Sequence, residues 1–306
     1  MKAIARTVGT ALILVTMCVL GATPAQPQSA DRQHFASPEA GADALVAAAK
    51  ANDESALVAM FGAKHRDLIS SVDKARDREL RARFAELAEQ YRVFRPEPDG
   101  SVILVVGFEA WPFPIPLVKA GATWRFDTEA GIDEVLNRRI RENELEAIET
   151  LQAYVEAQKA YAAKPRDGSN VRQFAQRIRS APRKRDGLYW EANPAAGDEV
   201  SPAGPLIHDP GSRAPGDPYN GYYFKILTRQ GPAAPAGRYS YVINGRMIAG
   251  FAMVAYPADY GKTGVMSFLV NHYGVLYQKN LGPNMSRIAQ GMTEYNPDRT
   301  WKAVAE

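Results

Sequence analysis

The chain has 306 residues, 46% of them apolar, with 37 lysines and arginines against 34 acidic residues. A net charge of +3 is too small for general electrostatic binding to nucleic acid, so we expect no nucleic-acid partner. A chain of this length can form two modest domains, each with a hydrophobic core.

The first 25 residues have the pattern of a secretory signal peptide. Lys2 and Arg6 precede an apolar run at residues 11–22, which is too short to cross a bilayer. We expect cleavage after Ala25; the alternative is an uncleaved N-terminal anchor. Cleavage also removes Cys18, the only cysteine, so the mature chain has no disulfide and no cysteine-based zinc site. The protein is therefore expected to be periplasmic or secreted, without a stable transmembrane span.

Residues 31–127 are predicted to form an N-terminal α+β domain. Ser37 caps a helix that begins at Pro38, and Asp53 caps a second helix that ends before Gly62. Apolar residues at helical spacing predict a third helix over residues 75–94. Strands are expected at residues 102–108 and 122–127, with an extended, proline-rich edge between them at residues 111–116. This order of elements resembles the small α+β cone of NTF2-like proteins, an analogy of fold alone.

Residues 128–163 form a long helical pattern that connects this domain to the rest of the chain. Its length predicts a break near Glu142 and Asn143, and its second half is expected to cover the C-terminal sheet. Residues 164–221 are rich in proline, glycine and charge, which favours loops with one short helix at residues 171–178.

Residues 222–306 are predicted to form a C-terminal antiparallel sheet. Asn244-Gly245 suits a type I′ turn, because both central residues of that turn need positive φ. The strand expected at residues 246–256 is apolar on both faces, so we place it at the centre of the sheet, covered on both sides. The other strands are expected at residues 222–228, 239–243, 265–271 and 275–279.

Several long motifs are similar to a bacterial family of secreted proteins known as domain of unknown function 2950. They are WPFPIPLV at residues 111–118, WRFDTEAG at 124–131, KRDGLYW at 184–190 and GYYFKILTRQG at 221–231. The resemblance implies an exported envelope protein with no established activity and no catalytic residues to transfer. Family members often carry an acidic calcium-type turn after the long helix, whereas residues 165–170 here keep only Asp167 as a carboxylate. We therefore expect no metal and no cofactor.

A second, weaker resemblance links residues 144–279 to the globular heads of type IV pilins and pseudopilins. Both have a helix, a variable loop and an antiparallel sheet in that order. The chain departs from pilins because about a hundred residues separate its hydrophobic N-terminus from this helix, and because it has no prepilin-type Gly-Phe-x-x-x-Glu junction. The resemblance implies a pilin-like head and not a pilus subunit.

Candidate binding residues are few, because the sequence has no HExxH, GxSxG or histidine cluster. The basic group Arg183, Lys184 and Arg185 either is a solvated loop or contacts an anionic partner. Trp190 follows this group and is expected to be open to binding, whereas Trp124 alternates like a core residue. Polar residues at the ends of predicted strands complete the candidates: Asp259, Tyr260, Lys262 and His272. A meander would place His272 at the opposite end of the sheet from the other three.

Two hypotheses of function follow. The first is a non-catalytic two-domain envelope protein that binds or scaffolds another envelope protein. The second is an enzyme or small-ligand binder that uses an apolar cavity in residues 31–127, marked by an inward Asp or Glu with a raised pKa. The sequence leaves open the oligomeric state.

Overall fold

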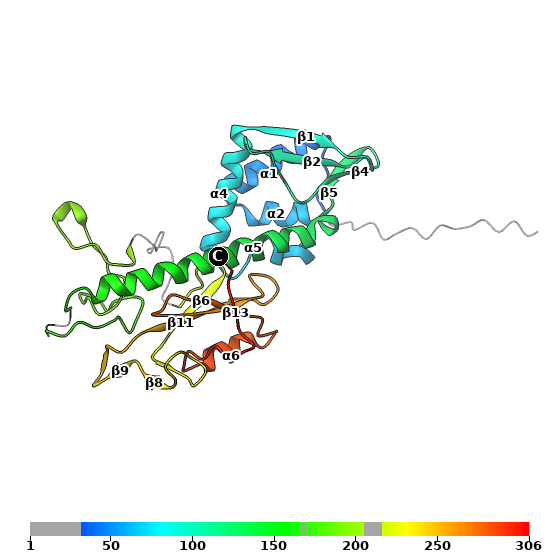
Figure 1. Ribbon diagram of the computed structural model, residues 1–306. Coiled ribbons are helices and arrows are strands. Elements are labelled where there is room, and N and C mark those ends of the chain that lie inside the picture. Colours follow the sequence, from blue (N-terminus) through cyan, green and yellow to red (C-terminus); the bar gives the residue numbers. More distant parts are fainter. Residues whose placement is uncertain (1–31, 167, 169, 205–215, 306) are drawn as a thin grey trace, which may run out of the picture. The chain divides into compact units, whose positions relative to one another are not determined.

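The computed structural model describes residues 32–166, 168, 170–204 and 216–305, and Figure 1 shows the arrangement of their helices and strands. The expected signal peptide at residues 1–25 and its cleavage site lie outside these residues. Asp31–Glu306 form one compact unit, which contains two hydrophobic cores. The described part is a mixed α+β structure with antiparallel sheets, as predicted.

The first helices begin where their capping residues predict. α1 (Pro38–Lys50) starts after Ser37, whose Oγ accepts a hydrogen bond from the Ala40 amide at 3.2 Å. α2 (Glu54–Phe61) starts after Asp53 in the same way and ends at Gly62, which has a φ of 93°. Two short helical segments follow, η1 (Ala63–His65) and α3 (Arg66–Ile69), which the sequence pattern did not predict.

The third predicted helix is shorter than expected. α4 (Lys74–Gln90) stops before Tyr91, and β1 (Arg92–Pro96) takes up residues that were expected to continue it. β1 pairs antiparallel with β2 (Val102–Val106), opposing Phe94 to Leu104. Apolar residues at helical spacing continue beyond the last residue of α4. These residues form a strand instead, because pairing in the hairpin outweighs their weak preference for a helix.

The N-terminal sheet packs on these helices. Its strand order is β1-β2-β4-β5, with β4 (Leu117–Ala120) and β5 (Thr123–Phe126) forming the second hairpin. β3 (Trp111–Pro112) pairs with β2 as a two-residue edge, which agrees with the extended, proline-rich segment expected there. The core of this part is made of side chains from the helices and the sheet, including Leu45, Phe61, Leu104, Leu117 and Phe126.

The long helix α5 (Thr128–Ala162) runs for 35 residues without interruption, so the predicted break near Glu142 and Asn143 is wrong. The polar residues that interrupt its apolar stripe make tertiary contacts instead. Glu142 forms an ion pair with Arg76 of α4, and the buried Asn143 Nδ2 donates to the Thr263 carbonyl at 2.9 Å. A polar position in a helix can mark an interface as well as an end.

The C-terminal sheet is antiparallel, in the order β14-β13-β12-β11-β6. Its strands are β6 (Tyr222–Leu227), β11 (Ala252–Pro257), β12 (Ser267–Asn271), β13 (Tyr277–Lys279) and β14 (Lys302–Ala303). Every residue of β11 is buried and the strand lies between two others, which confirms its predicted central position. β14 and α6 (Met285–Gly291) were not predicted.

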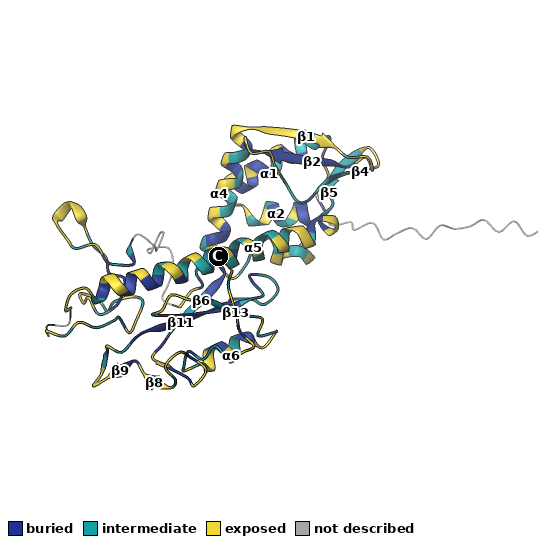
Figure 2. Cartoon of the chain, viewed as in Figure 1, coloured by how far each residue is buried: buried dark blue, intermediate teal, exposed yellow. Residues whose placement is uncertain are grey.

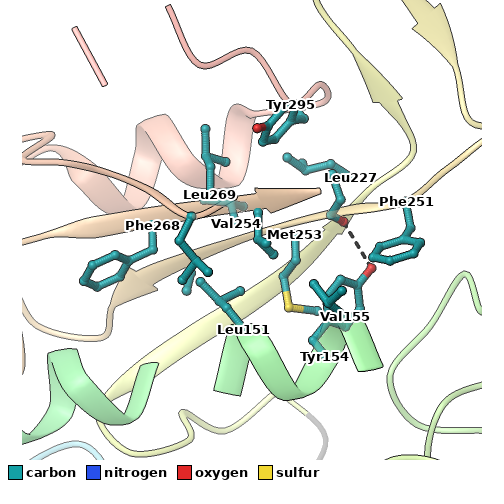
Figure 3. Close-up of a cluster of buried hydrophobic side chains, with 14 of the residues drawn as sticks. Leu151, Tyr154, Val155, Leu227, Phe251, Met253, Val254, Phe268, Leu269 and Tyr295 are labelled. Atoms are coloured by element: carbon teal, nitrogen blue, oxygen red, sulfur yellow. Dashed lines mark hydrogen bonds between the residues drawn. The ribbon is translucent and has the colours of Figure 1, made fainter. Parts of the chain in front are cut away.

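Two helices cover this sheet, one on each side (Figures 1 and 2). The second half of α5 packs on one face, as expected, and places Leu151, Tyr154 and Val155 against Met253 (Figure 3). The Tyr154 hydroxyl donates to the Ala252 carbonyl at 3.3 Å. Burial on both faces explains why β11 has an apolar side chain at almost every position.

Two small hairpins interrupt the expected run of strands. β7 (Arg229–Gln230) pairs with β8 (Tyr239–Ser240), and β9 (Val242–Ile243) pairs with β10 (Arg246–Met247). The β9–β10 turn has φ values of 49° at Asn244 and 78° at Gly245, as the type I′ prediction requires. The predicted strand at residues 246–256 is broken at Gly250, whose φ of 149° bends the chain between β10 and β11.

The helix predicted at residues 171–178 is absent from the described part of that segment. Phe174 instead bridges to Met247, and Gln158 of α5 exchanges two hydrogen bonds of 2.8 Å with the backbone of Ala175. The segment is held extended by the helix and hairpin beside it, which a local pattern could not reveal. Among the described residues of the loop-rich segment, a helical turn is present at η2 (Pro194–Ala196). Within the described residues, no helix has both the length and the apolar character needed to cross a membrane.

Candidate functional site

A cavity of about 770 Å³ lies in the N-terminal part of the structure, lined by facing residues of α4 and α5. α1, α2, α3, β2 and the segment 107–115 complete its wall (Figure 1 shows these elements). The volume is within the range of about 300–1,000 Å³ that is usual for sites of small molecules. Its largest apolar lining side chains are Leu45, Leu57, Phe61, Leu68, Ile69, Leu80, Phe84, Leu87, Phe108, Trp111, Phe113, Ile115, Val135 and Leu145.

The apolar lining continues to the surface of the protein. Phe108 is 80% exposed, Leu145 is 52% exposed and Trp111 is 37% exposed, although all three line the cavity. The Phe108 ring stacks on Tyr91, with 6.1 Å between ring centroids. Large apolar side chains that remain exposed at the edge of a hollow are typical of a binding site, because a ligand would remove them from water.

Five arginines also line the cavity, and two of them are fixed against its wall. Arg139 donates through Nη1 to the Asp67 carbonyl at 3.1 Å and through Nη2 to the Leu68 carbonyl. Arg81 donates to the Ile69 carbonyl at 2.5 Å and to Asn52 Oδ1 at 2.6 Å. These guanidinium groups satisfy the carbonyl groups of α3 and hold this helix at the cavity.

The remaining three arginines lie on the two long helices. Arg138 donates to Glu134 and to the Pro112 carbonyl, and its guanidinium lies 4.9 Å from the centre of the Trp111 ring. Arg83 of α4 and Arg141 of α5 are exposed, and neither has an ion-pair partner among the described residues. The two helices thus bring two unpaired cations to one apolar cavity.

Asp77 is the buried carboxylate of the cavity wall. Its two oxygens accept hydrogen bonds from the Ser71 amide at 2.6 Å and the Ser71 hydroxyl at 2.9 Å. Burial raises the pKa of Asp77, while the bonds from Ser71 and the charge of Arg139 act in the opposite direction. Because both oxygens are held by Ser71, the contacts of this carboxylate fix the chain before α4. An inward acid of this kind was the mark expected of a cavity-based function.

A second ionic cluster lies beside the cavity, around the buried guanidinium of Arg76. It forms ion pairs with Glu79 at 3.1 Å, with Glu142 at 3.0 Å and with Glu146. Burial, together with repulsion from Glu142 and Glu79, raises the pKa of Glu146 to about 7, against the attraction of Arg76. The cluster joins α4 to α5 through Glu142, which also lines the cavity.

The basic group of the loop-rich segment lies far along the chain from this cavity. Arg183 and Lys184 are exposed, and Arg185 forms an ion pair of 3.1 Å with Glu199. Trp190 is only 8% exposed, in contrast to the open ring expected, because it belongs to the C-terminal hydrophobic core; its Nε1 donates to the Glu199 carbonyl at 2.9 Å. The guanidinium groups of Arg166 and Arg185 lie 5.1 Å and 5.6 Å from its ring centre. The ring is therefore held by the core and contacted by two arginines.

The polar candidates of the C-terminal sheet fall into two separate places. Lys262 forms ion pairs with Asp67 at 2.8 Å and Asp259 at 3.2 Å, which ties their loop to α3. Tyr260 donates to Asn280 at 3.1 Å. His272 lies at the other end of β12, where burial lowers its pKa.

The ring of His272 packs in an aromatic group. Its centroid lies 5.6 Å from that of Tyr241 and 4.3 Å from that of Tyr273. The antiparallel order of strands predicts that His272 lies apart from Asp259 and Lys262, and the structure confirms this separation. Asp167, the one carboxylate of the expected calcium-type loop, lies outside the described residues.

An apolar cavity was expected within residues 31–127, whereas the observed cavity also has α5 in its wall. Leu80, Phe84 and Leu87 share one face of the helix predicted over residues 75–94, and a helical repeat does not distinguish a packed face from a cavity wall. A usable signal was present in α5, where Arg138, Arg141 and Leu145 follow at spacings of three and four and so share one face.

The fold and the cavity define a class of protein: a mixed α+β protein with an apolar, arginine-lined hollow. The chain belongs to the family described as protein of unknown function (DUF2950), whose sequence model matches residues 32–304. No curated protein and no solved structure matches the chain. The match confirms the family resemblance drawn from the motifs.

Proposed function

We propose that this protein binds a small, largely apolar molecule in the cavity between α4 and α5. The observation that carries the proposal is a hollow of about 770 Å³ whose apolar lining reaches the surface at Phe108, Trp111 and Leu145. Exposed side chains of this size lose contact with water when a ligand covers them, at about 25 cal/mol per Å² of apolar area. The proposal corresponds to the second hypothesis drawn from the sequence, a ligand-binding cavity in the N-terminal domain. We also propose that this domain has an NTF2-like fold.

The sequence supports two further parts of the proposal. The signal-peptide pattern of residues 1–25 supports binding in the periplasm or outside the cell. An inward acid with a raised pKa, such as Asp77, was expected both for an enzyme and for a ligand-binding protein. The hydrogen bonds that Asp77 accepts from Ser71 support a structural role for this carboxylate. We therefore propose binding without a reaction.

The test uses a neutral apolar dye, N-phenyl-1-naphthylamine, whose fluorescence rises in apolar surroundings. The full mature chain should bind it saturably, with one molecule per chain. Leu80→Trp fills the cavity and should weaken binding at least about tenfold, because the indole occupies space that the dye needs. The matched control is Ala82→Trp on the exposed side of α4, which does not line the cavity and should bind like the wild type.

Leu145→Trp, at the exposed rim, provides a second variant in case Leu80→Trp does not fold. Circular dichroism checks that each variant keeps its helix content. Equal dye binding by Leu80→Trp, Leu145→Trp and Ala82→Trp would place the dye elsewhere and overturn the proposal. Absence of saturable binding by the wild type would do the same.

The protein-binding hypothesis remains a separate prediction. It rests on the exposed cations Arg183 and Lys184 and on the proposed likeness of residues 144–279 to pilin heads. In-cell crosslinking of a tagged chain tests it: a single dominant envelope partner, lost when Arg183, Lys184 and Arg185 are changed to glutamate, is the expected result. A chain that crosslinks to nothing would contradict it.

A further inference from the structure

The cavity offers its ligand two chemically different regions. Its interior is apolar, with side chains such as Leu57, Phe61 and Phe113. Its charged lining consists of five arginines and three carboxylates, so cations are in excess. A ligand that is apolar throughout would use only the first region.

The carboxylates do not cancel the exposed cations. Asp77 accepts both of its described hydrogen bonds from Ser71, and Glu142 is paired with Arg76, which does not line the cavity. The third acid, Glu109, is exposed in the segment between β2 and β3. The charge of Asp77 acts on Arg81 and Arg139, and Glu142 is paired with Arg76, so neither acid is paired with Arg83 or Arg141.

The arginines differ in what they have left to bind. Arg81 and Arg139 donate to carbonyl groups of α3, and Arg138 is held by Glu134 and Trp111. Arg83 and Arg141, one on each long helix, are exposed, with no ion pair to any described residue. A guanidinium group presents up to five donors and stays charged at any physiological pH, so each of these two arginines is suited to bind a carboxylate or phosphate.

We propose that the ligand is an amphiphile with one apolar chain and an anionic head, whose chain enters the cavity and whose head binds Arg83 and Arg141. This inference rests on the proposed function and narrows it to one chemical class. A single-chain carboxylate such as dodecanoate is the simplest member. The apolar chain provides affinity through burial, and the two arginines discriminate between heads of different charge.

The test compares three ligands with the same twelve-carbon chain, each below its micelle or solubility limit: dodecanoate, dodecanol and dodecyltrimethylammonium. Displacement of N-phenyl-1-naphthylamine from the full mature chain gives their affinities. Dodecanoate should bind at least about tenfold more tightly than dodecanol, and dodecyltrimethylammonium should bind most weakly. All three ligands share the binding free energy of the same apolar chain, so the difference comes from attraction or repulsion between the head and the arginines. The preference for dodecanoate should shrink as sodium chloride is added.

Charge reversal at the two arginines locates the head. Arg83→Glu with Arg141→Glu should remove the preference for dodecanoate and favour the cation, while affinity for dodecanol stays within about twofold. Arg78→Glu is the matched control on α4: it is an exposed arginine that does not line the cavity, so it should leave the order of the ligands unchanged.

Each outcome separates the two proposals. Equal binding of dodecanoate and dodecanol by the wild type would overturn the anionic head while leaving an apolar ligand in place. A preference for dodecanoate that survives the reversal of both arginines would overturn the assignment of the head to these residues. If none of the three ligands displaces the dye and the dye itself does not bind, the proposed function fails as well.

Discussion

At the scale of single residues, Arg76 shows how a buried charge is shared. Its guanidinium faces Glu79, Glu142 and Glu146, and one positive charge cannot neutralise three carboxylates. Glu146 has the most buried side chain of the three, and its pKa is raised to about 7 from an ordinary value of 4.5. The cluster binds α4 to α5 at a free-energy cost that depends on pH.

The sign of this dependence follows from the direction of the shift. A carboxyl with a pKa raised by folding binds its proton more tightly in the folded state than in the unfolded state. Its contribution to stability is complete below about pH 4.5 and is lost as the pH rises through about 7. The cost of burying the Glu146 carboxylate, together with repulsion from Glu142 and Glu79, therefore grows over the range in which Glu146 ionises.

We predict that Glu146→Gln reduces the pH dependence of stability. Between pH 5 and pH 8 the wild type should lose about 2 kcal/mol more free energy of unfolding than the variant, because glutamine has no proton to lose. Urea titrations at the two pH values measure this difference. Glu149→Gln, at an exposed position of α5, is the control and should follow the wild type. Parallel pH profiles for wild type and Glu146→Gln would contradict the prediction.

At the scale of elements, α5 serves two cores. Its first half lines the cavity with Val135, Arg138 and Arg141, and its second half covers the C-terminal sheet with Leu151 and Tyr154. A 35-residue helix of mixed polarity needs such packing, since helix propensity alone contributes little in water. The same element therefore holds the candidate site and stabilises the sheet.

We predict that Leu151→Ala destabilises the protein by about 2–5 kcal/mol, the usual cost of an apolar cavity in a packed core. The Leu151 side chain is fully buried and packs against the sheet (Figure 3). Urea unfolding followed by circular dichroism measures the change. Gln152→Ala, the exposed neighbour on the same helix, should change stability by less than about 0.5 kcal/mol. A small effect of Leu151→Ala would mean that α5 does not depend on this contact.

At the scale of the whole described chain, hydrogen bonds connect the segments that form the two cores. The Gly221 amide donates to Asp73 Oδ2 at 3.2 Å, and Asn143 donates to the Thr263 carbonyl. Glu144 Oε1 accepts from the amides of Val265 and Met266, both at 2.9 Å. Because α5 also belongs to both cores, melting one core would remove support from the other.

We predict that the mature protein unfolds in a single calorimetric transition, with equal calorimetric and van't Hoff enthalpies. Asn143→Ala combined with Glu144→Ala removes three of the connecting hydrogen bonds and should separate the transition into two. Differential scanning calorimetry tests both statements. Two transitions in the wild type would show that the cores unfold independently. Glu156→Ala, an exposed position near the end of α5, controls for loss of a carboxylate.

The sequence alone determined those features that depend on local chemistry. Ser37 and Asp53 define helix starts because their side chains accept backbone hydrogen bonds within one turn. Asn244-Gly245 defines a turn because both residues tolerate positive φ, and the apolar run of β11 defines a strand covered on both faces. The family motifs, which extend over most of the chain, determined the family.

Tertiary structure decided the features that depend on distant partners. Residues 171–178 are extended because Gln158 and Met247 bind their backbone, and α4 ends early because Phe94 pairs with Leu104. Trp190 is buried because it packs in the C-terminal core, with Arg166 and Arg185 against its ring. The cavity belongs to the same class: apolar stripes on α4 and α5 have the same spacing whether they pack tightly or face a hollow, and only the distance between the helices distinguishes the two.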